Sequence, residues 1–325
     1  MIVRPSRLTA LLCTAALASL VVALSVGSVD LGLGVFRDVL TGQRDSIGAI
    51  IITELRLPRA LSAFAVGGLL ALAGALLQVL LRNPLADPYI LGLSGGAAVA
   101  ALAAILVGLG GAWVAGSAFG GSLLSTFLVF GLSRLDGAWT HTRLLLTGVV
   151  VAAGWGALIS FILAISPEGS LHNMLFWLMG DLSRAHHPIS ANAVLLLGLV
   201  LSLWLARSLN LLARGDLTAA ALGENPAQVR IAIYFIAALL TATAVTVAGS
   251  IGFVGLIIPH AVRLLSGTDH RGLIPNTVLL GGSFLVVADT LARTVIAPVQ
   301  LPVGVITALL GVPVFLFLLS RTRSP

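Results

Sequence analysis

The chain has 325 residues, of which 58% are hydrophobic and only 9% are charged. A soluble domain carries about 25% charged residues, so this composition excludes an ordinary soluble protein and indicates a membrane protein with several spans. All 18 basic residues are arginine. A P-loop ATPase needs a lysine on the nucleotide phosphates, so that class is excluded as well. The net charge of +6 does not predict a nucleic-acid partner, because the arginines stand singly near the ends of apolar runs.

The apolar runs predict ten membrane helices. In chain order we place them at about residues 8–27, 58–81, 90–108, 112–132, 144–166, 189–206, 230–249, 254–266, 273–294 and 303–320. The first run could also be a signal peptide, but its length of about 20 residues and the runs that follow favour a retained helix. Ten spans put both termini on one side. The loops of that side hold twelve arginines against six on the other, which predicts that both termini are cytoplasmic.

The apolar sequence is interrupted after the second run. Two prolines and three glycines fall between Arg82 and Gly96, and both residue types destabilise a helix interior. In lipid, a broken helix is tolerated only where its backbone is buried in protein or faces a water-filled cavity. The interruption therefore predicts part of a transport path, and an ordinary loop between two spans is the alternative.

A second interruption follows the seventh run, between Gly249 and His260. Interruptions at matching places in two halves of a chain point to a transport site between inverted repeats. We therefore predict an all-α membrane protein of two inverted-topology five-helix halves.

Small residues at helical spacing predict close packing of helices within this bundle, because they let backbones approach one another. They are the stripe Gly67, Ala71 and Ala75 and the pairs Gly92/Gly96 and Gly116/Gly120.

The longest polar segment on the cytoplasmic side covers about residues 207–229. Asp216 is suited to capping a short helix that runs to Leu222, and Gly223 is suited to ending it. A short helix at the inner surface would suit the docking of a partner protein. A membrane-surface helix without a partner is the alternative.

Arginines also mark the outer side, at the start of the second run and the end of the ninth. Asp289 lies four residues before Arg293, so the pair could orient that guanidinium. Arginine is the side chain best suited to bidentate recognition of carboxylates. Together with Arg56 and Arg59, Arg293 could meet acidic residues of an outside partner. Interfacial anchoring of the three side chains is the alternative.

The residue patterns predict neither catalytic residues nor a metal site. The six histidines form no ligand set with cysteine or carboxylates, and neither a nucleophile elbow nor a helical metalloprotease motif occurs. An ion-coupled carrier usually keeps an ionisable relay inside the bundle, and no acid or base lies clearly in the middle of a span. A stand-alone secondary transporter, the alternative function, is therefore disfavoured, and energy supplied from outside the membrane is favoured.

Motifs from about residue 50 to the C-terminus, in order and correctly spaced, are similar to those of one family. They are Arg56–Arg59, Asn83–Pro88 with Gly92–Gly96, Ala221–Glu224, Gly252–His260, Thr268–Arg271, Ala288–Arg293 and Leu301–Val305. They resemble the FecCD-type permeases, the membrane subunits of ABC importers for ferric siderophores, haem and cobalamin. The resemblance implies the type II ABC importer permease fold, with ten transmembrane helices and a single permease domain over residues 1–325.

The resemblance also implies partners and a location. It implies a second permease subunit in a homodimer, two ATPase subunits, a periplasmic substrate-binding protein and the inner membrane as the site of the complex. ATP and Mg²⁺ would bind to the ATPase, and the chain itself would hold no cofactor. The cargo favoured by this family is a ferric siderophore.

Residue roles are implied by position in the motifs. The residues that would dock the binding protein are Arg56, Arg59 and Arg293. The residues that would couple to the ATPase are Ala221, Leu222, Gly223 and Glu224. The cytoplasmic gate would consist of Asn83, Leu85, His141 and Thr142. The path would follow the fifth helix along the subunit interface, past Thr147, Val151, Gly154, Leu158 and Ser160. His141 departs from the family pattern, because relatives commonly carry small hydroxyl residues there.

Overall fold

A computed structural model of the chain describes residues 5–27, 46–134, 140–183 and 188–321, together with residues 35, 38 and 185. The described residues form helices joined by turns, without a strand among them. In chain order the helices are α1 (Pro5–Ser25), α3 (Ile47–Ile50), η1 (Ile51–Arg56), α4 (Leu57–Leu80), η2 (Pro88–Leu91), α5 (Leu93–Leu106), α6 (Gly111–Leu132), α7 (His141–Ile165), α8 (Glu168–Met179), α9 (Pro188–Trp204), α10 (Ala206–Ala213), α11 (Asp216–Ala221), α12 (Pro226–Ala248), α13 (Val254–Ser266), α14 (His270–Thr294) and α15 (Val303–Arg321).

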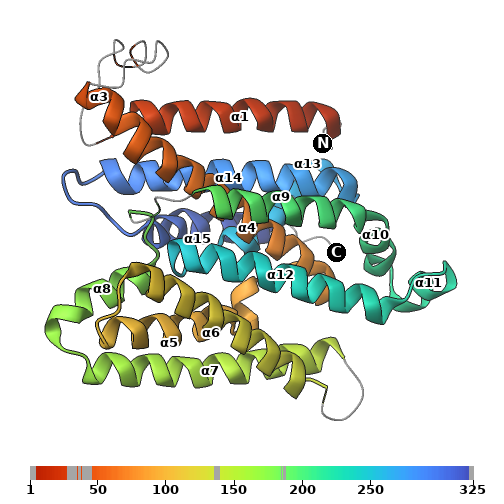
Figure 1. The fold of residues 1–325 in the computed structure, drawn as a ribbon. Coiled ribbons are helices and arrows are strands. Elements are labelled where there is room, and N and C mark those ends of the chain that lie inside the picture. Colours follow the sequence, from red (N-terminus) through yellow and green to blue (C-terminus); the bar gives the residue numbers. More distant parts are fainter. Residues whose placement is uncertain are drawn as a thin grey trace.

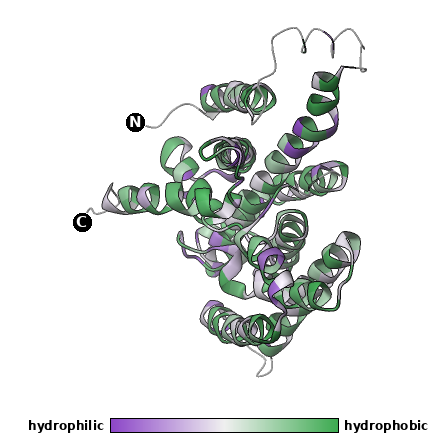
Figure 2. Ribbon diagram, turned by 90° about the vertical axis from the view of Figure 1, so that its left-hand side faces the viewer, coloured by the Kyte–Doolittle hydropathy of each residue, from purple (hydrophilic) through white to green (hydrophobic). Residues whose placement is uncertain are grey.

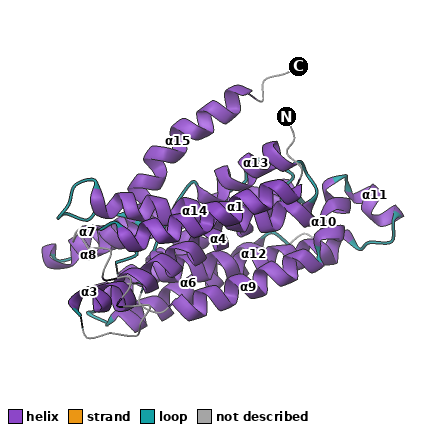
Figure 3. Cartoon of the chain, turned by 90° about the horizontal axis from the view of Figure 1, so that it is seen from above, coloured by secondary structure: helices purple, strands orange, loops and turns teal. Residues whose placement is uncertain are grey.

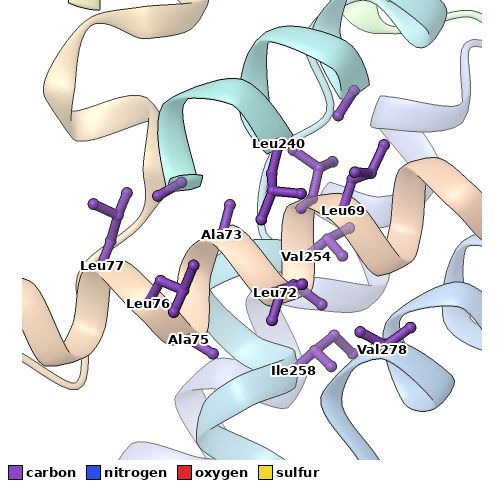
Figure 4. Close-up of a cluster of buried hydrophobic side chains, with 14 of the residues drawn as sticks. Leu69, Leu72, Ala73, Ala75, Leu76, Leu77, Leu240, Val254, Ile258 and Val278 are labelled. Atoms are coloured by element: carbon purple, nitrogen blue, oxygen red, sulfur yellow. The ribbon is translucent and has the colours of Figure 1, made fainter. Parts of the chain in front are cut away.

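Helix α4 is the centre of the bundle. It packs against α1, α9, α12, α13 and α14, and most of its side chains are buried. Its sequence is apolar on every side, as expected of a helix that is covered all round. Figure 4 shows Leu69, Leu72 and Leu76 of α4 among side chains of α12, α13 and α14, including Leu240 and Val278.

The other helices form layers on either side of this centre. Figure 1 shows α1 along one side and α5, α6 and α7 stacked on the other. Helices α10 and α11 lie at one end of the molecule and α3 and α8 at the opposite end (Figures 1 and 3). Apolar residues cover most of the length of the helices (Figure 2), as a lipid environment requires.

Backbones touch directly in the centre. A Cβ atom on Gly67 would lie 2.2 Å from the carbonyl oxygen of Gly281, and one on Gly74 would lie 1.9 Å from that of Gly255. Helices α14 and α13 therefore approach α4 as closely as a glycine backbone permits. The close packing predicted at Gly67 is confirmed.

Helices α5 and α6 approach each other in the same way. A Cβ atom on Gly96 would lie 2.4 Å from the Gly121 carbonyl oxygen. The predicted contact through Gly116 and Gly120 is not made between helices of the described part of the chain, where no atom lies within 4 Å of a Cβ on either residue. The residue of α6 that meets α5 is Gly121, one position after Gly120.

Each of the ten predicted spans falls on an apolar helix. Among the described residues, six helices are long and apolar enough to cross a membrane, or seven if α9 and α10, which meet at a 59° bend, are counted as one span. Helices α5 and α13, with 14 and 13 residues, are shorter. The second predicted span begins earlier than expected, because α3, η1 and α4 continue from one to the next between Ile47 and Leu80.

The two halves of the chain correspond in the order of their elements. Helices α4 and α12 each end in a break, and each break is followed by a short helix of 14 (α5) or 13 (α13) residues. Both short helices begin after a residue with left-handed backbone, Gly92 (φ 73°) and Phe253 (φ 70°). Because α4 starts near α3 and α12 starts near α11, the two helices run in opposite directions (Figure 1), as the predicted inverted topology requires.

Candidate functional site

The two breaks meet inside the molecule. The backbone N–H of Ile251, in the second break, donates a hydrogen bond to the hydroxyl of Tyr89, in the first, at 2.8 Å. Pro88 also packs closely on α13, since a Cβ atom on Gly255 would lie 2.6 Å from the Pro88 Cδ. The sequence predicted each break but not their contact, and it gave no reason to single out Tyr89.

Polar groups freed in the first break find partners within it. The carboxylate of Asp87 accepts a hydrogen bond from the Tyr89 N–H at 2.8 Å, and the side-chain oxygen of Asn83 accepts one from the Leu85 N–H at 2.9 Å. These bonds satisfy backbone donors that a helix would otherwise have paired. The interruption predicted between Arg82 and Gly96 is thus an ordered, irregular segment between α4 and α5.

Helix α7 rests directly on this first break. A Cβ atom on Gly148 would lie 2.9 Å from the carbonyl oxygen of Ile90. The indole N–H of Trp155 donates to the Ser125 hydroxyl at 2.9 Å, and that hydroxyl donates to the Gly92 carbonyl at 2.8 Å. A movement of the first break would therefore displace α7 or break its contacts with the break.

Four of the five predicted path residues share one face of α7. Thr147, Val151, Gly154 and Leu158 follow one another at intervals of four, three and four residues, which places them on one side of a helix. Thr147 and Val151 are half-buried, and Gly154 and Leu158 are exposed. Ser160 lies about 200° around the helix from Leu158, and its hydroxyl donates to the Gly156 carbonyl at 3.0 Å.

Most of the surface of α7 is left uncovered by the described part of the chain. Only 11% of the most apolar 18-residue stretch of α7 is buried, less than in the five other helices that are long and apolar enough to cross a membrane. Its exposed residues are mainly apolar, such as Leu146, Val150 and Phe161. A surface of this kind faces either lipid or another subunit.

The predicted gate residues lie near the end of the molecule that carries α11. His141 is the first residue of α7 and lines a small cleft with Leu80, Thr140, Leu144 and Arg230. It also lies within electrostatic reach of Arg82, the neighbour of Asn83. Leu85 and Thr142 are exposed.

Helix α11 begins differently from the prediction. Gly215 is the N-cap, so the predicted capping by Asp216 is wrong. Asp216 is the first residue of the helix, and its carboxylate pairs with Arg82 at 2.5 Å and with Arg230 through the other oxygen. The two arginines compete with the helix N–H groups for the carboxylate, and a charged partner makes the stronger hydrogen bond.

The end of α11 is as predicted. Gly223 has left-handed backbone (φ 84°), and the N–H groups of Gly223 and Glu224 donate to the carbonyls of Ala220 and Ala219 at 3.1 and 3.0 Å. This is the glycine-terminated helix end known as the Schellman motif.

Two leucines project from α11 and its end. Leu217 is 89% exposed and Leu222 is 54% exposed. Sequence reasoning named Leu222 and missed Leu217, although an apolar residue within a polar segment is itself a signal. Glu224 accepts a hydrogen bond from the Ser208 hydroxyl of α10 at 3.0 Å, which fixes the exit of α11 to the neighbouring helix.

The three predicted docking arginines lie together at the end of the molecule opposite to α11. Arg59 binds Asp289 through two nitrogens, with Nη2–Oδ1 at 2.8 Å and Nε–Oδ2 at 3.0 Å. The predicted pair of Asp289 and Arg293 is also present, at 3.3 Å. Arg56 donates to the carbonyls of Leu24 and Ser25, at the end of α1, at 2.7 and 3.0 Å.

These contacts bind the three guanidinium groups to other residues of the same chain and leave little of them exposed. Arg56 is 5% exposed and Arg293 is 8% exposed, while Asp289 is almost fully buried at 1%. In this structure the arginines therefore join α1, α4 and α14. Their role in docking an outside partner stays a prediction.

A family model described as the FecCD transport family matches residues 15–321. The chain belongs to the FecCD transport family. The resemblance inferred from the motifs is thereby confirmed, and one family model spans almost all of the chain.

Relatives in the FecCD family cover most of the chain. The hemin transport system permease protein HmuU of Yersinia pestis is 40% identical over 94% of this chain and 94% of its own length. The cobalamin import system permease protein BtuC of Halobacterium salinarum is 44% identical over 83% of this chain and 73% of its own length.

The fold agrees with a solved structure described as an inward-facing conformation of a metal-chelate type ABC transporter. The two chains superpose with a TM-score of 0.88 at 32% identity, covering 97% of this chain and 99% of the other. The predicted all-α permease fold is confirmed. This member of the FecCD family is a multi-pass membrane permease of the ABC importer class.

Proposed function

We propose that the chain is the membrane-spanning permease subunit of an ATP-driven importer that moves a metal chelate from the periplasm to the cytoplasm by alternating access. The observation that carries the proposal is the meeting of the two helix breaks at Tyr89 and Ile251, with α7 resting on the first of them. Irregular backbone at matching places in two halves is the arrangement found where transporters bind and pass their cargo.

The proposed cargo class is a bulky metal chelate: cobalamin, haem or a ferric siderophore. The exposed face of α7 offers mainly apolar, weakly interacting side chains, along which a large chelate could slide. The named relatives are permeases for hemin and for cobalamin. The ferric siderophore favoured by the sequence stays a prediction.

A second copy of the chain would cover this face of α7, so that the path runs along the interface of a homodimer. Two ATPase subunits, which bind the ATP and Mg²⁺, would dock at α11 around Leu217 and Leu222. At the opposite end, a periplasmic binding protein would place acidic residues near Arg56, Arg59 and Arg293. The complex would lie in the inner membrane with both termini of the chain cytoplasmic.

In this mechanism ATP changes the balance between inward-facing and outward-facing states. Moving such an equilibrium from 1:99 to 99:1 takes about 5.5 kcal/mol, which the ATPase supplies through α11. The chain itself contributes two irregular segments that can change shape without unfolding a helix. No proton or sodium gradient is needed.

Reconstitution tests the proposal. The chain is placed in proteoliposomes with its ATPase and binding protein, and uptake of labelled cobalamin, haem and a ferric siderophore is measured with ATP, without ATP, and with an ion gradient only. We expect uptake of one chelate that requires both ATP and the ATPase. Uptake driven by the ion gradient in the chain alone would instead establish a secondary transporter.

A further inference from the structure

Asp216 holds three separate parts of the chain together by its charge. It begins α11, and its two carboxylate oxygens pair with Arg82, the residue that opens the first break, and with Arg230, near the start of α12. Arg82 and Asp216 are 134 residues apart in sequence. The carboxylate therefore joins α11 to the first break and to the helix that leads into the second.

Arg82 occupies a backbone position at which glycine is the usual residue. Its φ is 47°, and the N–H groups of Arg82 and Asn83 donate to the carbonyls of Val79 and Gln78 at 3.2 Å each, which closes α4 with a Schellman motif. Left-handed backbone is unfavourable for a long side chain. The side chain found there is the one that reaches Asp216, so the strained residue is accounted for by this ion pair.

The pairs are only partly shielded from water. The side chain of Asp216 is 38% exposed, that of Arg82 36% and that of Arg230 12%. Ion pairs with this exposure add little to the free energy of unfolding, because water competes for both charges. They are thus suited to being broken and re-formed during a movement of α11.

We propose that Asp216 is a positioning residue that transmits the movement of α11 to the two helix breaks, through Arg82 to the first and through Arg230 and α12 to the second. The inference rests on the proposed function and adds a residue to it. Leu222 and Glu224 are proposed to contact the ATPase. Asp216 is proposed to pass the resulting movement of α11 on to the two helix breaks.

The test uses the assembled complex in proteoliposomes with loaded binding protein. Uptake, ATP hydrolysis and the amount of assembled complex are measured for the wild type, Asp216→Asn and Asp216→Glu. The matched control is Arg271→Gln, which removes an exposed arginine from the first turn of α14. We expect Asp216→Asn to lower the number of chelates moved per ATP by about 3- to 30-fold, the size of change typical of residues that couple two sites, with assembly unchanged. Asp216→Glu and Arg271→Gln should keep the wild-type ratio.

A charge reversal provides the second variant. Arg82→Asp, Asp216→Arg and Arg230→Asp in one chain restore all the attractions, and aspartate is tolerated at the left-handed position of Arg82. We expect this triple variant to regain at least half of the coupling ratio that the single change Asp216→Arg loses.

Two results would overturn the inference. One is an unchanged coupling ratio in Asp216→Asn. The other is a loss of uptake and hydrolysis in proportion to a loss of assembled complex, which would make Asp216 merely structural. Failure of the proposed function is distinguishable, because the wild-type complex would then show no ATP-driven uptake at all.

Discussion

The hydroxyl of Tyr89 accepts a hydrogen bond at 2.8 Å from the backbone N–H of Ile251, and this bond joins the two irregular segments of the chain. Each segment lies at the end of a long helix, and the two are 162 residues apart. The contact places the least regular backbone of both halves at one point beside α7. It gives the structure a point at which a change in the irregular segment of one half can affect that of the other.

Replacing Tyr89 by phenylalanine should destabilise this point. The Ile251 N–H would lose its acceptor in a buried environment, which costs about 1–3 kcal/mol. Thermal unfolding of the purified chain in detergent measures the effect. The matched control is Tyr234→Phe, where the hydroxyl donates to the Thr126 carbonyl of α6 at 2.8 Å. That carbonyl keeps its helical partner, so the control should lose less than half as much, and equal losses would contradict the role given to Tyr89.

Removing the charge of Asp289 should destabilise the opposite end of the bundle. Asp289→Asn leaves Arg59 and Arg293 without their buried counter-charge, and breaking a buried ion pair costs about 3 kcal/mol or more. Chemical or thermal unfolding in detergent provides the measurement. Arg59→Lys retains the charge but loses the two-pronged geometry, so its loss should be smaller. A variant Asp289→Asn that unfolds like the wild type would show that the arginines do not depend on this carboxylate.

Replacing Gly74 of α4 by alanine should strongly destabilise the fold, whereas replacing Gly120 of α6 should have little effect. In Gly74→Ala the new Cβ would lie 1.9 Å from the Gly255 carbonyl oxygen, so α4 and α13 must separate, at a cost of about 1–3 kcal/mol or more. In Gly120→Ala the new Cβ meets no atom of the described residues within 4 Å, so the unfolding free energy should change by less than about 0.5 kcal/mol. Yield of monodisperse protein and unfolding temperature distinguish the two variants. Similar behaviour of both would refute the direct backbone contact.

A charge on the exposed leucines of α11 should weaken binding of the ATPase subunit. Burial of one leucine contributes about 1.5–3 kcal/mol, so Leu222→Asp or Leu217→Asp should reduce the affinity at least about tenfold. Binding of the purified ATPase to the chain in nanodiscs measures this, with insertion checked by expression level. Glu168→Gln, on α8 at the other end of the molecule (Figure 1), is the control. Unchanged affinity in both leucine variants would remove α11 from the proposed interface.

The hydrogen bonds of Asp269 should make the stability of the folded chain depend on pH. The side chain of Asn210 donates to its carboxylate at 2.8 Å, and this bond, together with one from the Arg271 N–H, lowers the pKa of Asp269 below its usual value of about 3.9. The folded state thus favours the charged form, so its stabilising effect is present above about pH 4 and is lost as the pH falls through the lower folded-state pKa. The difference in unfolding temperature between wild type and Asp269→Asn should shrink below about pH 4. A difference that does not change between pH 3 and pH 6 would contradict this assignment.

Hydropathy located the helices because it depends only on composition along the chain. The ten apolar runs each contain a helix, and the prolines and glycines between Arg82 and Gly96 marked the first break correctly. Hydropathy predicted a short run at residues 254–266, which matches α13, but it predicted α5 longer than its 14 residues and did not extend the second span back to Ile47. Those two limits depend on how the segments pack in three dimensions, which composition does not encode.

The sequence did not predict most of the contacts between residues that lie far apart in the chain. Asp216 was expected to cap α11, and local sequence gave no sign that Arg82 and Arg230 would take its carboxylate instead. Likewise, Arg293 was correctly paired with Asp289 by its spacing of four residues, whereas Arg59 comes from 230 residues away. Spacing rules work within one helix, and partners on other helices become visible only once the fold is known.

The glycine contacts at Gly67 and Gly74 divide the chain into parts that differ in how freely they can deform. Because the backbones of α13 and α14 touch α4 at these two points, sliding or rotation of one helix against another would bring main-chain atoms into collision. We therefore expect helices α4, α13 and α14 to move together. The contact between Gly96 and Gly121 locks α5 to α6 in the same manner. We expect a change of conformation to alter the irregular backbone that connects these helices, residues 81–92 and 249–253, rather than the helix contacts themselves.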